Sequence, residues 1–529
     1  MKKIDHSVCR LLLLTALIGS VFPCYTMAQV RQFSPTSSGK TGPPHVVVLR
    51  NLPHTQLPST GKMVQMPDAS HYTATLLQRI QQMQIPPHWG TATPELDPSQ
   101  VSARTLKGGS NHGNTVESTQ SVSLGNYWNG LCCTGYTPPD PIIAAGDGYE
   151  LQAVNLALVV YNSSGAQEYY ATFQDFFGSL TIGLDLSDPK VLYDQYSNRW
   201  VILLLAYHDP QPGSGTYISD YLIGISETSD PTQAWYTYSI SALTNNYFAD
   251  FPGLGVDANA IYVTSNQWNT LNPNLTQTFQ YAQLFVFNKS QFYSGQSANY
   301  YVFDDNDFVN ADGTYAFTVK PAHEYGTAPG EYLLNIATLT GRKNPPLTGN
   351  FISVWTITSP LSNPVLLLQG TITVGSYANS PAVQAEGSVA INPDAASASD
   401  VVYNAGYAYT SFTTAYNWGS GTVSAIRYEK IDVNTDVADI DAVYGADLTY
   451  YFYPNIFVDA WGDIGLCFNI SSSSQYIGTY YAVRTPFDSQ LEGSLSHCRL
   501  GRAPIPFLED GGGTTVGYAL MEITTTSFG

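Results

Sequence analysis

The chain has 529 residues, with 21 Lys or Arg against 41 Asp or Glu, so its formal net charge is −20 at pH 7. This acidic balance excludes the basic surface on which binding to nucleic acid or to anionic lipid depends. Charged residues make up only 12% of the chain, so neutral polar side chains must cover most of the surface, as suits an exported protein that stays soluble or binds cations.

Residues 1–28 have the three-part layout of a secretory signal peptide. Lys2 and Lys3 form a positive start, an apolar run covers 11–22, and small residues precede Gln29. The apolar run is shorter than the roughly 20 residues that a membrane-spanning helix needs, and no later stretch reaches that length. We therefore expect a secreted or periplasmic protein without a transmembrane segment.

Residues 29–118 have the composition of an irregular extension. They are rich in Pro, Ser, Thr, Gln and His and contain few apolar runs. One stretch, 74–85, places apolar residues at helical spacing and stops at a Pro-Pro pair, which predicts a short helix. The extension is expected either to pack on the main domain or to be removed as a pro-segment.

The remaining domain, 119–529, consists of short alternating strands divided by Gly, Asn, Asp and Pro turns. A unit of short strand, polar turn and buried strand starts near residues 141, 189, 252, 317, 382 and 455. Spacings of roughly 50–70 residues fit a four-stranded blade with its loops. The pattern predicts an all-β propeller. Seven blades are favoured over six because 514–525 can pair with 121–128, and a tandem pair of β-sandwiches is the alternative fold.

Several of these phrases resemble a recurring family of secreted bacterial β-propeller proteins. They are DPKVLYDQYSNRW at 188–200, IGISETSDP at 223–231, DFPGLGVD at 250–257, LFVFNKS at 284–290 and the run 454–474. The resemblance covers roughly residues 140–490 and implies a propeller fold and export, but no activity. The chain departs from the family at its end, where Arg499-Leu500-Gly501-Arg502 stands in place of an Arg-Trp-Gly-Asp-Tyr phrase.

Four cysteines follow the signal peptide, namely Cys132, Cys133, Cys467 and Cys498. An even number in an exported chain predicts two disulfides. Two cysteines lie near the start of the repeats and two near their end, and a closed ring brings those ends together. We expect Cys132 and Cys133 each to bond one of the later two; a bond between the neighbours Cys132 and Cys133 is the alternative.

Two clusters of Asp and Asn predict structural calcium, a hard cation that takes six to eight oxygen ligands. The expected ligands are Asp305, Asp307, Asn310 and Asp312 in the first cluster, and Asp432, Asn434 and Asp436 in the second. The same residues would equally suit acidic surface loops in which Asp and Asn cap turns.

The sequence indicates the function of the protein less clearly than its fold. The repeats contain neither a zinc-binding HExxH pair nor a GxSxG nucleophile elbow. Aromatic residues are 13% of the chain, and Trp268, Tyr416 and Trp418 in loops are candidates for contact with a sugar or a protein.

We expect an extracellular binding or adhesion module for a glycan or protein ligand. The alternatives are a polysaccharide hydrolase or lyase that uses carboxylates in the central channel, and a structural surface-layer component. An enzyme should bring Asp, Glu, Arg or His together in the channel, with one of them strongly buried and perturbed. A binding module should carry an aromatic patch on a rim.

Overall fold

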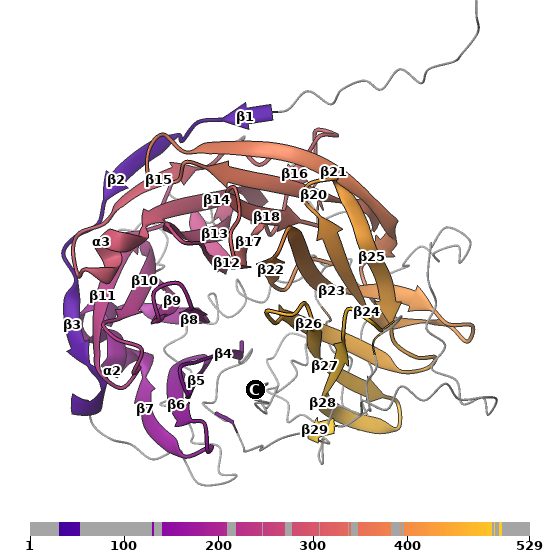
Figure 1. Ribbon diagram of the computed structural model, residues 1–529, viewed down its shortest axis with the longest axis horizontal. Coiled ribbons are helices and arrows are strands. Elements are labelled where there is room, and N and C mark those ends of the chain that lie inside the picture. Colours follow the sequence, from indigo (N-terminus) through magenta and orange to yellow (C-terminus); the bar gives the residue numbers. More distant parts are fainter. Residues whose placement is uncertain are drawn as a thin grey trace, which may run out of the picture.

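The computed structural model describes residues 31–52, 130–131, 140–208, 218–245, 247–269, 278–305, 307–336, 338–339, 348–381, 393, 396–488, 491 and 497–499. Figure 1 shows their strands in successive sheets around a common centre, in chain order from β4 to β29. The all-β propeller predicted from the sequence is confirmed. In the described part of the chain, no helix has the length and apolar character needed to cross a membrane.

The described strands form six antiparallel units of four strands, which we number as blades 1 to 6. Blade 1 is β4 (Ile142–Gly146), β5 (Tyr149–Val154), β6 (Ala157–Asn162) and β7 (Gln167–Thr172). Blade 2 is β8 (Asp185–Asp194), β9 (Arg199–His208), β10 (Ile218–Ser226) and β11 (Ala234–Ser241). Blade 3 is β12 (Phe248–Val256), β13 (Ala260–Asn269), β14 (Thr278–Asn288) and β15 (Asn299–Phe303).

Blade 4 is β17 (Lys320–Tyr325), β18 (Glu331–Asn335), β20 (Thr348–Thr358) and β21 (Val365–Ala378). Blade 5 is β22 (Val401–Asn404), β23 (Tyr407–Asn417), β24 (Thr422–Asp432) and β25 (Val437–Tyr444). Blade 6 is β26 (Tyr450–Val458), β27 (Ile464–Ser472), β28 (Gln475–Arg484) and β29 (His497–Arg499). Seven blades stays a prediction, because 121–128 and 514–525 lie outside the described residues.

Short elements fill the connections between these strands. They are the helices α2 (Phe173–Phe177) and α3 (Lys289–Tyr293), the 3-10 turn η4 (Gly178–Thr181), and the small β16 (Tyr315–Ala316) and β19 (Thr338–Leu339) pair. Thr172 caps α2 by accepting a hydrogen bond from the backbone N–H of Asp175, as N-cap threonines commonly do.

The innermost strands of blades 3, 4 and 5 run parallel to one another around the centre. β12 pairs with β17 at Val256 and His323, and β17 pairs with β22 from Ala322–Val401 to Tyr325–Asn404. Parallel pairing places the starts of these strands at one end of the channel and their ends at the other. This arrangement positions the charged residues described below.

The hydrophobic cores lie between neighbouring blades. One cluster joins β9 and β10 of blade 2 to β13 and β14 of blade 3, and similar clusters join the other successive pairs. Trp200 shows why the repeated phrase matters. Its ring is fully buried, lies 4.8 Å from that of Tyr193, and donates from Nε1 to the Ser229 carbonyl at 2.8 Å. The buried indole thus finds the polar partner that it needs.

The N-terminal segment follows the outer wall of the ring and adds a fifth strand to three blades (Figure 1). Antiparallel pairs join β1 (Arg31–Phe33) to β21, β2 (Ser37–Lys40) to β15, and β3 (His45–Val48) to β11. The 3-10 turn η1 (Leu49–Asn51) then buries Leu49. We call residues 31–52 the belt. The part of the extension that the structure describes is therefore packed on the propeller, and the helix expected at 74–85 lies outside the described residues.

Candidate functional site

Five of the innermost strands have a backbone kink near their start, either within the strand or just before it. At this point a residue other than glycine takes a left-handed conformation, namely Asp140 (φ 43°), Asp188 (55°), Phe251 (50°), Thr318 (59°) and Tyr453 (50°). In β8, β12 and β26 the pairing register also shifts there. Bulges and left-handed residues of this kind re-aim side chains and are frequent beside functional sites.

The preceding blade holds three of the kinks in place. In each case a side chain of that blade accepts a hydrogen bond from the backbone N–H of the kinked residue. The bonds run from Asp188 to Asn155 Oδ1 (3.0 Å), from Thr318 to Asn266 Oδ1 (2.9 Å) and from Tyr453 to Thr413 Oγ1 (3.0 Å). The kinks are therefore built into the contacts between blades.

Charged side chains from four blades meet around Lys320 at the start of β17. Lys320 is 1% exposed, donates to the Pro252 carbonyl at 3.1 Å, and lies 3.9 Å from the centre of the Phe251 ring. Burial, followed by the neighbouring ammonium of Lys190, lowers the pKa of Lys320 to about 7. The carboxylates of Asp400, Asp188 and Asp250 act in the opposite direction on the pKa of Lys320. We call Asp188, Lys190, Asp250, Lys320 and Asp400 the axial cluster.

Asp188, a member of this cluster, lies at the kink of β8. Burial raises the pKa of Asp188, and Lys190 and the backbone N–H of Phe251 offset part of that increase. Asp188, Asp250 and Asp400 are half-buried, so they keep some contact with solvent, whereas Lys320 is buried. Three aspartates and two lysines from four blades thus lie near one another.

The opposite ends of the same strands carry a second, sealed group of charges. Lys289 Nζ lies 3.0 Å from Asp194 Oδ2, which also accepts a 2.7 Å hydrogen bond from Tyr293. Burial, followed by Asp257, raises the pKa of Glu324 to about 9. Burial, followed by Glu324, raises the pKa of Glu331 well above its ordinary value. All these charged side chains are nearly inaccessible, so we assign this group to the stability of the blade junction.

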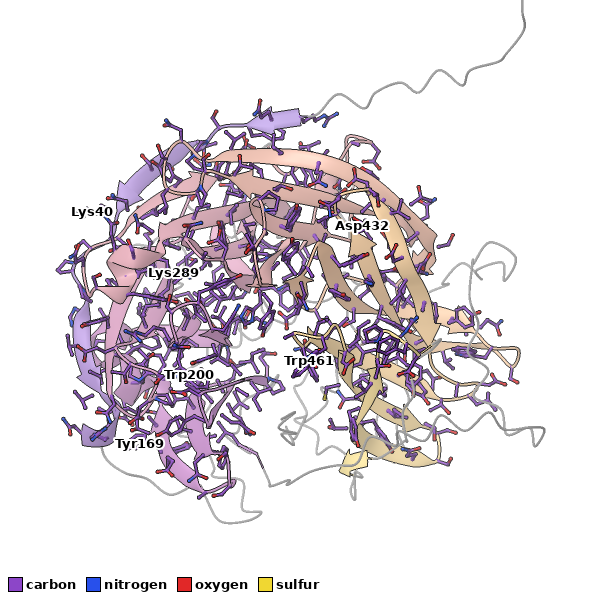
Figure 2. All side chains as sticks on the ribbon, in the orientation of Figure 1. Lys40, Tyr169, Trp200, Lys289, Asp432 and Trp461 are labelled. Carbon is purple, nitrogen blue, oxygen red and sulfur yellow. The ribbon has the colours of Figure 1, made fainter. Side chains whose placement is uncertain are left out.

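A groove of about 410 Å³ lies between the ends of blades 5 and 6. Tyr407, Lys430, Asp439, Trp461 and Arg484 are among the residues that line it. Trp461 is 75% exposed and lies toward the middle of the ring in Figure 2. The sequence analysis missed this residue, although its position in the polar turn between β26 and β27 was a usable signal.

The three aromatic residues predicted for ligand contact are half-buried and lie elsewhere. Trp268 packs edge-on against Phe279, with 6.0 Å between ring centroids. Tyr416 and Trp418 meet at the end of the β23–β24 hairpin, 4.4 Å apart. The structure therefore brings Tyr416 and Trp418 together in blade 5 and leaves Trp268 in blade 3. Their role in ligand binding stays a prediction.

The first predicted calcium loop makes internal hydrogen bonds. Asp307 Oδ2 accepts from the backbone N–H of Asp304 at 3.0 Å, and Asp312 Oδ1 accepts from that of Thr314 at 2.9 Å. Asn310 is fully buried, and Asp305 has a left-handed φ of 49°. Among the described residues, no three His, Cys, Asp or Glu side chains are placed to hold a metal ion. Calcium at this loop stays a prediction.

The second predicted calcium loop closes the turn between β24 and β25. Asp432 Oδ1 accepts from the backbone N–H of Asn434 at 2.9 Å, and Asp436 Oδ1 accepts from Gln369 Nε2 at 3.0 Å. The backbone hydrogen bond from Asn434 is the largest cause that lowers the pKa of Asp432. These contacts are those of a capped turn, and calcium here also stays a prediction.

The predicted disulfides fall largely outside what the structure describes. Cys467 is half-buried in β27, and Cys498 belongs to β29. Cys132, Cys133 and the side chain of Cys498 lie outside the described residues. The pairing between the start and the end of the repeats therefore stays a prediction.

No protein-family model and no curated protein matches the chain. Solved structures overlap with it at low similarity. An endo-arabinase from Bacteroides thetaiotaomicron is 12% identical with a TM-score of 0.31, over 69% of this chain and 98% of that one. An exo-β-1,3-galactanase from Phanerochaete chrysosporium is 10% identical with a TM-score of 0.31, over 66% and 80%. An endo-arabinanase from Bacillus licheniformis is 10% identical with a TM-score of 0.28, over 66% and 94%.

Overlaps at these TM-scores carry no information about activity. The fold and the site by themselves define a β-propeller with a charged cluster near the starts of its innermost strands and a groove lined by aromatic side chains at the ends of blades 5 and 6.

Proposed function

We propose that this protein hydrolyses glycosidic bonds of a polysaccharide at its axial cluster. One observation supports the proposal above the others. Carboxyl groups from blades 2, 3 and 5 gather around a buried lysine of blade 4, at a place that keeps partial contact with solvent. Glycoside hydrolysis needs two carboxyl groups in different protonation states beside the scissile bond.

The shifted pKa of Asp188 suits the proton donor. Because burial favours its neutral form, Asp188 can pass a proton to the oxygen of the leaving sugar as the bond from that oxygen to the anomeric carbon breaks. Asp250 or Asp400 would take a proton from the water whose oxygen forms the new bond to that carbon. Lys320 contacts neither water nor sugar in this scheme; in its charged form it attracts the carboxylates of Asp250 and Asp400 and so keeps them in place.

The direct test is release of reducing ends from a panel of arabinan, galactan, xylan, mannan and β-glucan. We expect at least one polysaccharide to be cleaved, and Asp188→Asn to lower kcat/KM by about 100-fold or more, the usual contribution of a general acid. Asp147→Asn is the matched control, because Asp147 is an exposed turn residue with a similar φ of 46°. Thermal unfolding of both variants shows whether the fold is retained.

Two results would overturn the proposal. One is full activity of Asp188→Asn on a polysaccharide that the parent cleaves. The other is a parent protein that binds polysaccharide without releasing reducing ends, which would favour the binding or adhesion role expected from the sequence. Export, indicated by residues 1–28, forms part of the proposal, and the protein would act on glycans outside the cytoplasm.

A further inference from the structure

The turn between β26 and β27 holds an indole out in solvent. Trp461 is 75% exposed, whereas Trp200, Trp235 and Trp355 are fully buried. Leaving a large apolar ring in water forgoes the stabilisation that its burial would bring. Exposed aromatic side chains that line a groove are therefore candidates for ligand contact.

The backbone that carries this indole is held by its own turn. Asp459 Oδ1 accepts from the backbone N–H groups of Trp461 and Asp463, both at 2.9 Å. Gly462 supplies the left-handed residue that the turn requires, with φ 86°. Asn404 of blade 5 donates to the Asp459 carbonyl at 2.7 Å and so ties the turn to the neighbouring blade. A ligand that binds here therefore need not order the backbone of the turn.

The facing wall of the groove belongs to blade 5 and is polar. Lys430 Nζ lies 3.8 Å from the centre of the Tyr407 ring and 3.9 Å from Asp439 Oδ2. Arg484, at the end of β28 in blade 6, also lines the groove, and its guanidinium donates to the Tyr428 hydroxyl at 3.3 Å. The groove thus offers an aromatic face together with charged donors and an acceptor.

This combination matches a sugar ring, which has an apolar face of C–H groups and hydroxyl groups around its edge. We propose that the groove between blades 5 and 6 is a separate glycan-binding site, in which a neutral pyranose stacks on Trp461 and its hydroxyls contact Lys430, Asp439 and Arg484. An apolar peptide fits less well, because it would cover Lys430, Asp439 and Arg484 without hydrogen bonds to replace their contact with water. A cavity of about 410 Å³ lies within the usual size range of ligand sites.

The groove is independent of the axial cluster. Trp461 follows the end of β26, whereas the kinked residue Tyr453 lies near its start. Asp188 lies at the corresponding kink of β8. The two sites therefore belong to opposite ends of the channel, and binding in the groove does not depend on chemistry at the axial cluster.

The experiment measures binding of neutral hexaoses, made of mannose, xylose, glucose or N-acetylglucosamine, to the full-length protein. Isothermal titration calorimetry gives the affinity, and tryptophan fluorescence reports on the indole. We expect Trp461→Ala to weaken binding of at least one hexaose by about tenfold or more, and Trp461→Phe to weaken it less. Leu448→Ala is the matched control, since Leu448 is 63% exposed and does not line the groove.

The inference is overturned if no hexaose binds, or if Trp461→Ala binds as tightly as the parent. Thermal unfolding should be unchanged in Trp461→Ala, because an exposed side chain contributes little to stability. Asp188→Asn separates this site from the proposed hydrolase. It should keep the affinity for the hexaose, and Trp461→Ala should keep hydrolysis of a short soluble substrate.

Discussion

The innermost strands carry charged side chains at both of their ends, and the two groups differ in their contact with solvent. At their starts, Lys320 is surrounded by half-buried aspartates that keep contact with solvent. At their ends, Asp194 has Lys289 and Tyr293 as partners and is fully buried. Buried charges are costly unless they are paired, so burial raises the pKa of Glu324 and of Glu331 at this end and favours their neutral forms.

Glu324 gives a pH-dependent prediction. Its folded-state pKa of about 9 lies above the ordinary value of 4.5, so the folded protein binds a proton that the unfolded chain releases. The resulting stability is fully present below about pH 4.5 and is lost as the pH rises through about 9. We expect the melting temperature to fall between pH 5 and 9, and to fall less steeply in Glu324→Gln.

Thermal unfolding across this pH range checks the prediction. Glu168→Gln serves as the control, because Glu168 is exposed and should leave the slope of the parent unchanged. An identical slope in the parent and in Glu324→Gln would contradict the assignment of a protonated Glu324.

At the level of elements, the belt covers the outer edges of blades 2, 3 and 4. Open sheet edges favour unwanted pairing with other chains, and a fifth strand removes that hazard. The belt is held mainly by backbone ladders of three or four residues each, with Leu49 as its buried anchor. Its attachment should therefore be sensitive to single close contacts.

Gly39 makes such a close contact with Tyr300. A Cβ at this position would lie 2.5 Å from Cζ of Tyr300, whose ring packs beside Phe285 and Phe287. We expect Gly39→Val to detach β2, to destabilise the protein by about 1–3 kcal/mol, and to speed proteolysis within 31–52. Gly42→Val is the control, because a Cβ there meets nothing within 4 Å. Equal rates of proteolysis in the two variants, followed by mass spectrometry, would contradict the role of this contact.

For the whole molecule, the important feature is that each core belongs to two blades. The cluster with Trp200 joins blades 1 and 2, and the cluster with Phe468 joins blades 5 and 6. A blade therefore buries its apolar surface only against its neighbours, and the first and last blades need partners as well. A covalent link between the two ends of the repeats would supply part of this closure.

Peptide mapping of the unreduced protein tests that link. We expect peptides that contain Cys132 and Cys133 to be joined to those that contain Cys467 and Cys498. We also expect reduction to lower the stability by about 2–4 kcal/mol, the usual effect of a structural disulfide. A bond between Cys132 and Cys133, or free thiols at all four positions in the unreduced protein, would contradict this closure.

The all-β class and the repeats could be predicted because their causes are local. Alternation of apolar and polar residues specifies strands, and the run from Asp194 to Trp200 carries its own turn and buried anchor. The axial cluster could not be predicted, since Asp188, Asp250, Lys320 and Asp400 are far apart in the chain and meet only when four blades surround one axis.

The tertiary structure also decided which aromatic side chains are exposed to solvent. Trp268, Tyr416 and Trp418 were predicted in loops, yet packing half-buries all three, whereas Trp461 in the turn between β26 and β27 stays in solvent. The strands of the belt are too short for their sequence pattern to predict that they pair with three blades far away in the chain. The alternation of apolar and polar residues in the sequence thus determined the strands of this protein. Only the packing of the blades around an axis decided which side chains face each other and which face water.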